Sequence, residues 1–394
     1  MDAIVVDRFL VHEESSTEPA SFEFSSPHRS LSAFGIGEMI HLPALGAGRP
    51  GFPLQEAVQG ALERARLDGQ DDPIVVGAIP FDLARPSVLF VPERWAAVPG
   101  RLPGATPPTA LAAPVIGRFS SPDRGGFEDA VRQAVETIRD GAVRKVVLSR
   151  ILDIELARPV TPGVVRAALG AQNPGGFHFS LPLPDGSTLV GASPELLIRK
   201  TGRAIFANPL AGSARRQADP AADDSVAARL LASDKDVHEH RFVTAGIRRV
   251  LAPLCRRLDI PDRPGLMNTP TMWHLSTSIA GDLADDDMSV LRLACLMHPT
   301  AAVCGAPTAE AQALIRRLEP FDRGLFSGIV GWCNAAGDGE WAITIRCGTI
   351  DGRHVRLFAG AGIVEGSDPA SEWAETGAKL GTMLRAFGID GDAP

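Results

Sequence analysis

Short turns rich in glycine divide the chain into pairs of strand-like segments, and this pattern most restricts the possible fold. Residues 177–192 break at Pro184-Asp185-Gly186, and residues 195–209 break at Thr201-Gly202. A turn of two or three residues can join antiparallel strands, whereas parallel strands need a crossover of a dozen residues or more. The pattern therefore favours antiparallel sheets.

Helices alternate with these hairpins. Apolar residues from Phe127 to Ile138 recur in helical steps, and Gly141 is a suitable helix end. We expect further helices over residues 54–66, 224–258 (interrupted at Pro253) and 368–387, and strands over residues 74–81, 145–156, 328–333, 340–349 and 354–359. Hairpins interleaved with long helices predict an α+β fold, with large antiparallel β-sheets and helices packed outside.

A proline-rich stretch separates the N-terminal part from the rest. From Pro99 to Pro114 the chain carries five prolines and two glycines, which is typical of a connector. We expect an N-terminal subregion of residues 1–115 that completes the sheets of a core over residues 119–390, so that residues 1–394 form a single domain. Residues 13–30, rich in Ser, Glu and Pro, are expected to form loop or poorly ordered chain.

Charge and cysteine content argue against several classes of protein. The chain has 39 Lys and Arg against 47 Asp and Glu, a formal net charge of −8, so neither nucleic acid nor an anionic membrane is an expected partner. Five scattered cysteines without a CxxC motif favour a reducing compartment. We find no signal peptide and no run of about 18 apolar residues. We expect a cytoplasmic protein, and a monomer because no heptad pattern is evident.

Two acidic pairs each share a face of an expected helix. Asp236 and Glu239 lie three residues apart, as do Glu372 and Glu375. Oxygen ligands without a cysteine cluster suit a hard cation such as Mg²⁺. Acidic pairs with this spacing also occur on solvated helix surfaces, so the spacing leaves both interpretations open.

Two other motifs resemble known binding motifs but do not match them. The histidines of His238-Glu239-His240 lie about 200° apart around a helix, whereas the zinc motif needs a separation of four residues, so we predict no zinc site. The glycines of residues 360–366 lack the spacing of a dinucleotide-binding loop and are expected to form a tight turn.

Three charged residues adjoin expected strands. Alternation over residues 341–346 places Arg346 on a small, polar face, where its guanidinium could bind a carboxylate. A charge that protects an edge strand is the alternative. Lys145 and Glu195 each adjoin a strand, and taken alone either is typical of a solvated residue.

Nine short blocks follow one another between residues 145 and 380. They are KVVLSR (145–150), GASPELLIRK (191–200), PLAGSARR (209–216), ASDKDVHEH (232–240), HPTAAVCG (298–305), EPFDRGLFSGIVGW (319–332), ITIRCG (343–348), FAGAGIV (358–364) and SEWAETGAKL (371–380). Together they resemble the isochorismate synthases, a branch of the chorismate-utilising enzyme family that also contains anthranilate, aminodeoxychorismate and salicylate synthases. The resemblance implies that family's fold.

The resemblance also implies Mg²⁺ as the cofactor and chorismate as the substrate. Its metal ligands fall on Glu239 and Glu375, with Asp236 and Glu372 as nearby or water-mediated ligands. The metal would hold the ring carboxylate of chorismate. The residues implied to contact the substrate are Gly212, Ser213, His298, Ala302, Arg346, Gly360 and Lys379, with Arg346 on the pyruvyl carboxylate.

The implied reaction moves a hydroxyl group from C4 to C2 of the ring. Water attacks C2, the double bonds shift, and the C4 hydroxyl leaves. Lys145 matches the family's base and can act only when neutral, so its pKa would have to be lowered. Glu195 matches the acid and would have to stay protonated near pH 7.

Local residues distinguish members of the family. Aminodeoxychorismate synthases have a lysine where this chain has Ala211, which leaves room for water. Salicylate synthases share the implied acid, base and metal set and also eliminate pyruvate, but the small Ala302 and Val303 favour release of isochorismate. A binding protein without catalysis is a further alternative, and it would be expected to lack one of these groups. The motifs favour siderophore over menaquinone biosynthesis.

Overall fold

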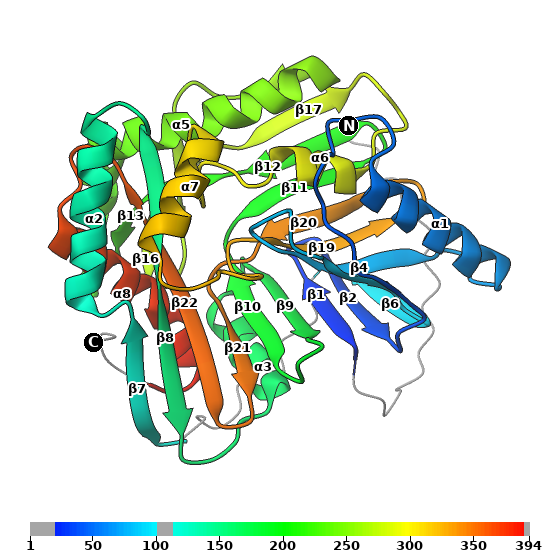
Figure 1. The fold of residues 1–394 in the computed structure, drawn as a ribbon, viewed down its shortest axis with the longest axis horizontal. Coiled ribbons are helices and arrows are strands. Elements are labelled where there is room, and N and C mark those ends of the chain that lie inside the picture. The colour runs from blue at the N-terminus through cyan, green and yellow to red at the C-terminus, as the bar shows by residue number, and fades with distance from the viewer. Residues whose placement is uncertain (1–19, 101–112, 390–394) are drawn as a thin grey trace.

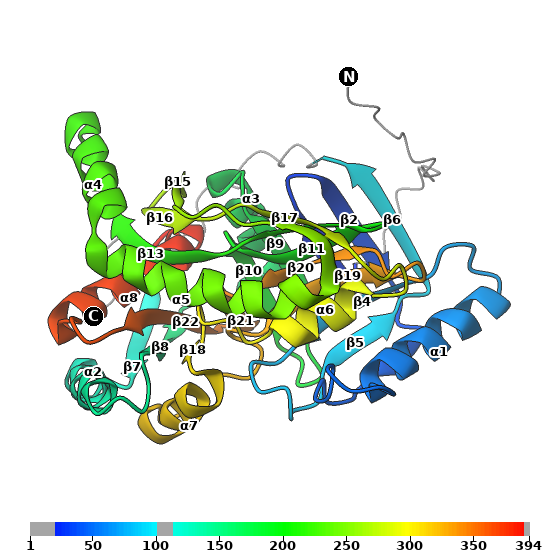
Figure 2. The ribbon, with the colours of Figure 1, turned by 90° about the horizontal axis from the view of Figure 1, so that it is seen from above.

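Two large antiparallel sheets, one of ten strands and one of nine, form the body of the protein (Figure 1). The computed structural model describes residues 20–100 and 113–389 of the 394. The sheets, with helices outside them, confirm the predicted α+β fold. Figures 1 and 2 show α1 (Pro53–Leu67) at one end of the molecule, and α2 (Arg124–Arg139) and α8 (Pro369–Ala386) at the other.

The ten-stranded sheet contains strands from both ends of the chain. Its order is β18 (Gly305–Ala306), β8 (Lys145–Leu156), β22 (His354–Ile363), β21 (Cys347–Asp351), β10 (Thr188–Ser193), β9 (Phe177–Pro182), β1 (Phe22–Ser25), β2 (Arg29–Phe34) and β6 (Arg94–Pro99), with β7 (Val115–Ser121) also paired to β8. The N-terminal strand β1 is held by antiparallel pairing with β9.

The nine-stranded sheet is built in the same way. Its order is β14 (Cys255–Asp259), β17 (Ile279–Leu283), β12 (Ala204–Asn208), β11 (Leu196–Thr201), β20 (Gly339–Ile343), β19 (Ile329–Asn334), β4 (Ile74–Ile79), β5 (Val88–Val91) and β3 (Glu38–Ile40). Here the N-terminal strand β4 pairs with β19. Most of the proline-rich connector, residues 101–112, lies outside the described residues.

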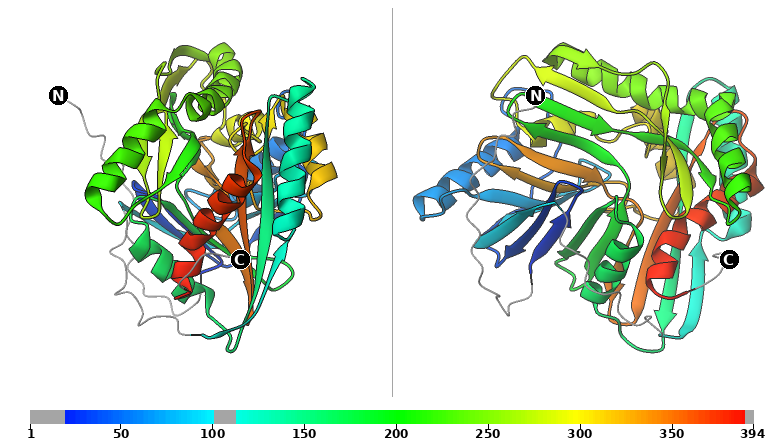
Figure 3. Two further views of the ribbon diagram at one scale, coloured as in Figure 1. Left: turned by 90° about the vertical axis from the view of Figure 1, so that its left-hand side faces the viewer. Right: turned by 180° about the vertical axis from the view of Figure 1, so that it is seen from behind.

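A small third sheet and the remaining helices complete the fold. The sheet consists of β13 (Leu210–Arg215), β16 (Met272–Ser276) and β15 (Gly265–Asn268). The helices are α3 (Pro162–Gln172), α4 (Pro220–Ala232), α5 (Asp234–Leu251), the 3₁₀ helix η1 (Ala252–Leu254), α6 (Val290–Met297) and α7 (Thr308–Leu318). Figure 3 shows α3 and α8 side by side on one face of the ten-stranded sheet. No helix within the described ranges is long and apolar enough to cross a membrane.

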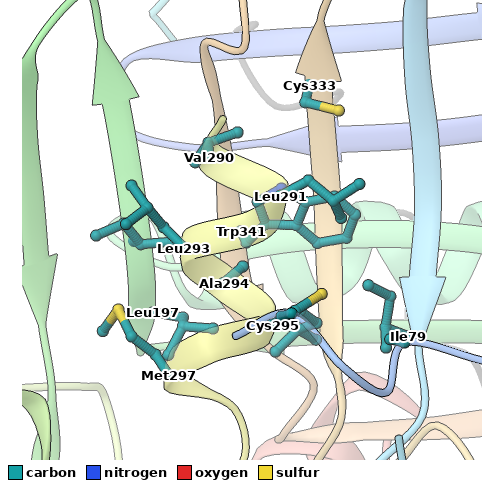
Figure 4. Close-up of a cluster of buried hydrophobic side chains, with 14 of the residues drawn as sticks. Ile79, Leu197, Val290, Leu291, Leu293, Ala294, Cys295, Met297, Cys333 and Trp341 are labelled. Atoms are coloured by element: carbon teal, nitrogen blue, oxygen red, sulfur yellow. The ribbon is translucent and has the colours of Figure 1, made fainter. Parts of the chain in front are cut away.

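Apolar side chains fill the space between the sheets and under the helices. Phe24 of β1, Phe179 of β9 and Trp332 of β19 belong to one buried cluster that both large sheets share. On the other face of the nine-stranded sheet, Leu291 of α6 packs over Trp341 of β20 (Figure 4). Each fully buried side chain of this kind contributes about 1.5–3 kcal/mol to the stability of the fold. The sheets therefore form a rigid support for the residues at their ends.

Two segments pass from one large sheet to the other, and each accepts a hydrogen bond from the strand that precedes the other segment. The first joins β10 to β11 through Pro194 and Glu195, and the second joins β20 to β21 through residues 344–346. The amide of Ile343 donates to the carbonyl oxygen of Glu195 (3.1 Å), and the amide of Ala192 donates to that of Arg346 (3.0 Å). Both charged residues are therefore fixed at the junction of the two sheets.

The second crossing corrects the expected strand over residues 340–349. The structure has two strands there, β20 and β21, in different sheets. Arg346 lies between them with φ +50°, so the expected alternation stops at Ile343 and Arg346 is not a residue of a strand. A side chain in this left-handed region is uncommon outside turns and functional sites.

Two other expectations were wrong in part. Residues 22–25 form β1 rather than loop, because Phe22 and Phe24 both point into the core from one face; residues 13–19 lie outside the described residues. The helix expected over 224–258 is divided at Ser233, whose extended backbone ends α4 and whose hydroxyl caps α5 by accepting from the amide of Asp236. Its last residues form β14 instead.

Most of the other expected elements are confirmed. The helices over 54–66 and 368–387 and the strands over 74–81 and 145–156 match α1, α8, β4 and β8 to within two residues at each end. The two expected hairpins form the pairs β9–β10 and β11–β12. These elements carry their signals within a few neighbouring residues, which is why sequence pattern located them.

Candidate active site

A cavity lies where the two crossing segments meet β8, β13, β22, α5 and α8. It holds about 650 Å³ of empty space, its open mouth included. The predicted site residues that line it are Glu195, Gly212, Ser213, Glu239, Ala302, Arg346, Gly360, Glu375 and Lys379. Lys145, Asp236, His298 and Glu372 lie outside this lining. Nine predicted residues that lie far apart in the sequence thus share one pocket.

Lys145 begins β8 and is fully buried directly behind the lining residue Glu239. Its Nζ lies 3.0 Å from Oε1 of Glu239. A buried charge is costly unless it is paired, so the two side chains hold each other in place. The interpretation of Lys145 as an ordinary solvated residue is therefore wrong.

Glycines in β22 provide the space for this ion pair. The expected tight turn over residues 360–366 is confirmed only at its end, where the Ser367 amide donates to the Val364 carbonyl oxygen (3.0 Å), whereas Gly360 and Gly362 belong to β22, which pairs with β8. A Cβ atom on Gly362 would lie 2.1 Å from Oε1 of Glu239, and one on Gly360 would lie 2.7 Å from Oγ of Ser149. Glycine is required because the glutamate approaches the strand backbone itself.

Glu195 is a buried carboxyl group in the first crossing segment. Burial raises its pKa from 4.5 to about 7, and this outweighs the opposing effects of the Leu210 amide, Lys145, Arg346 and Lys379. Its Oε1 accepts a long hydrogen bond of 3.3 Å from the Leu210 amide. A carboxyl with this pKa is partly protonated near neutral pH, as a general acid needs to be. Its burial also excludes the solvated-residue interpretation.

Arg346 is buried at the second crossing and joins a polar chain. Burial lowers its pKa to about 10, so the guanidinium stays charged. Its Nη2 lies 3.5 Å from Nε2 of His274, and Nδ1 of His274 lies 2.7 Å from Oγ of Ser213. Because a guanidinium only donates, Nε2 accepts and Nδ1–H donates to the Ser213 hydroxyl. The edge-strand interpretation of Arg346 is wrong, since the side chain lines the cavity.

His274 was missed by sequence reasoning. Burial, followed by the charges of Arg346 and Lys379, lowers its pKa well below the usual value, so the ring is neutral. It lies opposite Ser213 only because β13 pairs with β16 in the observed register. No local motif marks such a position, and only knowledge of that pairing could have identified it.

Phenylalanines supply the aromatic wall of the cavity. The rings of Phe326 and Phe358 stack with centroids 4.9 Å apart and planes 11° apart. Because the chain has no tyrosine, the stack presents no hydroxyl group to the cavity. His298 is buried nearby, edge-on to Phe81, and burial lowers its pKa to about 4. Its contact with substrate stays a prediction.

The acidic pairs face each other from α5 and α8. Lys235 links the helices through a 2.9 Å contact between its Nζ and Oε1 of Glu372. Burial, and then the charge of Glu375, raises the pKa of Glu372 to about 7. Burial also raises the pKa of Asp236, helped by the charges of Glu239 and Glu375. The interpretation that these pairs lie on solvated helix surfaces is wrong, since Glu239 and Glu372 are buried.

Lysines hold the glutamates that could bind a metal. Nζ of Lys379 lies 2.6 Å from Oε1 of Glu375 and donates to the carbonyl oxygen of Gly360 at 2.8 Å. Within residues 20–100 and 113–389, no three His, Cys, Asp or Glu side chains converge as a ready metal site. The histidines of His238-Glu239-His240 also diverge: His240 is buried, whereas the His238 ring packs edge-on to Phe242 at the surface.

We predict that Glu195 makes the fold less stable as pH rises. A carboxyl whose pKa is raised on folding contributes stability that is complete below its unfolded value of 4.5 and is lost as pH rises through about 7. Between about pH 4 and about pH 8, the natural protein should lose about 3 kcal/mol more unfolding free energy than Glu195→Gln, whose amide does not titrate. Urea unfolding of both proteins across this range measures the difference. The same pH dependence in both would contradict the buried, protonated carboxyl.

Comparison with known proteins agrees with the geometry. A curated putative isochorismate synthase of Aeromonas hydrophila is 47% identical over 401 aligned positions, which cover 99% of each chain. A crystal structure of a putative 2,3-dihydroxybenzoate-specific isochorismate synthase from Bacillus anthracis superimposes with a TM-score of 0.88 at 40% identity, covering 94% of this chain and 97% of that one. The menaquinone-specific isochorismate synthase of Escherichia coli gives a TM-score of 0.80 at 25% identity, covering 95% and 89%.

A family model agrees with these pairwise similarities. The model described as chorismate binding enzyme matches residues 103–388, a range that includes every site residue discussed above. This agrees with the resemblance seen in the nine sequence blocks. With near-complete coverage by relatives of more than 40% identity, the chain belongs to the chorismate-binding enzyme family.

Proposed function

We propose that this protein is a magnesium-dependent isochorismate synthase, which converts chorismate to isochorismate. The observation that carries the proposal is the buried Glu195, with a pKa of about 7, in the same cavity as Arg346 and Lys379. Two neighbouring cations suit a substrate carboxylate, and a carboxyl that keeps its proton suits a poor leaving group such as hydroxide. The curated relative of Aeromonas hydrophila bears this activity in its name.

Arg346 and Lys379 would bind and orient the substrate. The Arg346 guanidinium is buried and offers a planar pair of donors, which matches a carboxylate. Lys379 is held by Glu375 and by the carbonyl oxygen of Gly360, so its ammonium group is fixed at the cavity wall. We assign the pyruvyl carboxylate to Arg346 and place Lys379 beside it.

Lys145 and Glu195 would exchange protons with the reacting groups. Lys145 would have to give up its ion pair with Glu239 and its proton; as the neutral amine it would take a proton from the water that attacks C2. Glu195 would give its proton to the C4 hydroxyl, which leaves as water. One water enters and one leaves, so the reaction is an isomerisation. Glu239 is within 3.0 Å of Lys145 and restrains its amine.

The carboxylates of α5 and α8 fit a hard cation. The donors are all oxygen atoms, and Glu239 and Glu375 both line the cavity. Burial and mutual repulsion raise the pKa of Glu372 and Asp236, a cost that a divalent cation would relieve. Bound there, Mg²⁺ would neutralise and orient the ring carboxylate. Glu239 and Glu375 would have to exchange their lysine contacts for the metal.

We also propose that the product enters siderophore rather than menaquinone biosynthesis. The similarity to the 2,3-dihydroxybenzoate-specific enzyme of Bacillus anthracis (40% identity) exceeds that to the menaquinone-specific enzyme of Escherichia coli (25% identity). 2,3-Dihydroxybenzoate is a catechol, and catechols are typical iron-binding groups because they present paired oxygens to a hard metal ion.

Product analysis tests the proposed reaction. We expect purified protein incubated with chorismate to form isochorismate only when Mg²⁺ is present, as separated by chromatography. Salicylate with pyruvate would instead identify a salicylate synthase and would show that Ala302 and Val303 do not prevent elimination. A folded protein that binds chorismate without converting it would support a binding protein.

Removing the proposed base or acid should abolish most turnover. We expect Lys145→Ala and Glu195→Gln each to lower kcat at least about a hundredfold, the usual contribution of a positioned acid or base. Steady-state kinetics with chorismate and Mg²⁺ measures the loss, and circular dichroism checks the fold. A variant that is folded and nearly as active as the natural protein would contradict its assigned role.

Two glycines of one motif form a matched pair of tests. Gly362→Ala places a Cβ atom 2.1 Å from Oε1 of Glu239, so it should displace the Glu239–Lys145 pair and lower kcat/KM at least about a hundredfold. Gly366→Ala meets nothing within 4 Å and should leave kcat/KM within about threefold of the natural value. Equal effects of the two substitutions in the kinetic assay would show that Glu239 does not depend on this space.

A further inference from the structure

A β-bulge in β13 brings the chain backbone to the cavity. Leu210 lies opposite Ser276 and Ser213 lies opposite His274, so Ala211 and Gly212 together face the single residue between those partners. Such a bulge leaves backbone groups outside the regular ladder and redirects them, often beside an active site. Ala211 and Gly212 both line the cavity. The bulge therefore needs another contact to fix its orientation.

His240 of α5 supplies this contact. Its Nδ1 lies 3.1 Å from the carbonyl oxygen of Ala211, and its Nε2 lies 2.7 Å from Oγ1 of Thr277. A carbonyl oxygen only accepts, so Nδ1 carries the proton and Nε2 accepts from the threonine hydroxyl. The ring is buried, and both nitrogens have fixed roles. His240 thus holds the Ala211 carbonyl in one direction.

The direction of that carbonyl determines where the next amide points. The peptide bond between Ala211 and Gly212 is trans, so the Ala211 C=O and the Gly212 N–H point in opposite directions. His240 does not line the cavity, whereas both residues of this peptide do. With its oxygen directed at His240, the peptide presents its N–H away from α5.

Glycine is required at the second bulge position. Gly212 has φ +83°, and a Cβ atom there would lie 3.0 Å from Cβ of Asp236 and 3.2 Å from Cδ1 of Leu275. The absence of a side chain also leaves the amide open to an approaching oxygen. Backbone amides held in this way are effective donors to anions.

We propose that His240 is a positioning residue that orients the Ala211–Gly212 peptide so that the Gly212 amide donates a hydrogen bond to a carboxylate of the substrate. The inference rests on the proposed function, because it takes chorismate as the ligand. It gives a role to the second histidine of the motif that is unsuited to zinc. His240 acts through the bulge and does not itself touch the substrate.

Two substitutions of His240 test whether the position of its hydrogen-bond donor matters rather than the imidazole ring itself. Asn carries its amide nitrogen on Cγ, as His carries Nδ1, whereas the amide nitrogen of Gln lies one bond further out, like Nε2. We expect His240→Gln to raise the KM and Kd for chorismate about 10- to 100-fold, the usual effect of losing a hydrogen bond to a charged group. The kcat should change less than about threefold, because such a bond binds ground and transition states alike. His240→Asn should keep KM within about threefold.

Controls distinguish this role from a general effect on folding. His238→Gln makes the same change two residues earlier, on an exposed ring, and should leave KM and Kd unchanged. Thermal unfolding and active-site titration give the folded fraction, whose loss would lower the apparent kcat and leave KM alone. Calorimetric titration with chorismate gives Kd without requiring turnover.

The outcomes separate the two proposals. A natural protein that binds chorismate but forms no isochorismate overturns the proposed function, while the Kd values still judge His240. If the natural protein is active and His240→Gln binds chorismate normally, or if His240→Asn is impaired as severely as His240→Gln, the positioning role is wrong. Failure of the natural protein to bind chorismate overturns both.

Discussion

The site depends on two backbone hydrogen bonds, each of which joins a segment that crosses between the large sheets to the strand that precedes the other crossing segment. The amides of Ile343 and Ala192 donate to the carbonyl oxygens of Glu195 and Arg346. Because each crossing segment is fixed at both ends by strands and also accepts a hydrogen bond from the strand that precedes the other crossing, neither charged residue can move without breaking these backbone contacts. The left-handed backbone at Arg346 persists because these contacts hold it on both sides.

Burial at this junction explains the electrostatics of the cavity. Glu195 sits among cations and still has a raised pKa, because loss of hydration outweighs their attraction. Two lysines at the cavity are paired with glutamates, Lys145 with Glu239 and Lys379 with Glu375. Each pair joins or braces elements of the wall, so the same contacts that compensate buried charge also maintain the shape of the pocket.

Sequence pattern located those elements whose signals are local. The hairpins, α2, β8 and α8 were predicted because turn glycines and apolar spacing depend only on near neighbours. The misses arose where a distant contact decided the outcome. Gly360 and Gly362 are typical of a turn until Glu239 is known to approach the strand. Sequence alone could not place His274, because its role depends on the register of β13 against β16.

The sequence by itself determined the helices and strands that have local signals, the acidic pairs and, through its nine blocks, the family. Only the tertiary structure decided that Arg346 lies between sheets, that Glu195 is buried enough to hold a proton, and that His240 turns inward to the Ala211 carbonyl. The physical reason is the range of the interactions. Propensity and hydrophobic period act over one or two turns of chain, whereas desolvation and strand register depend on residues that lie far away in the sequence.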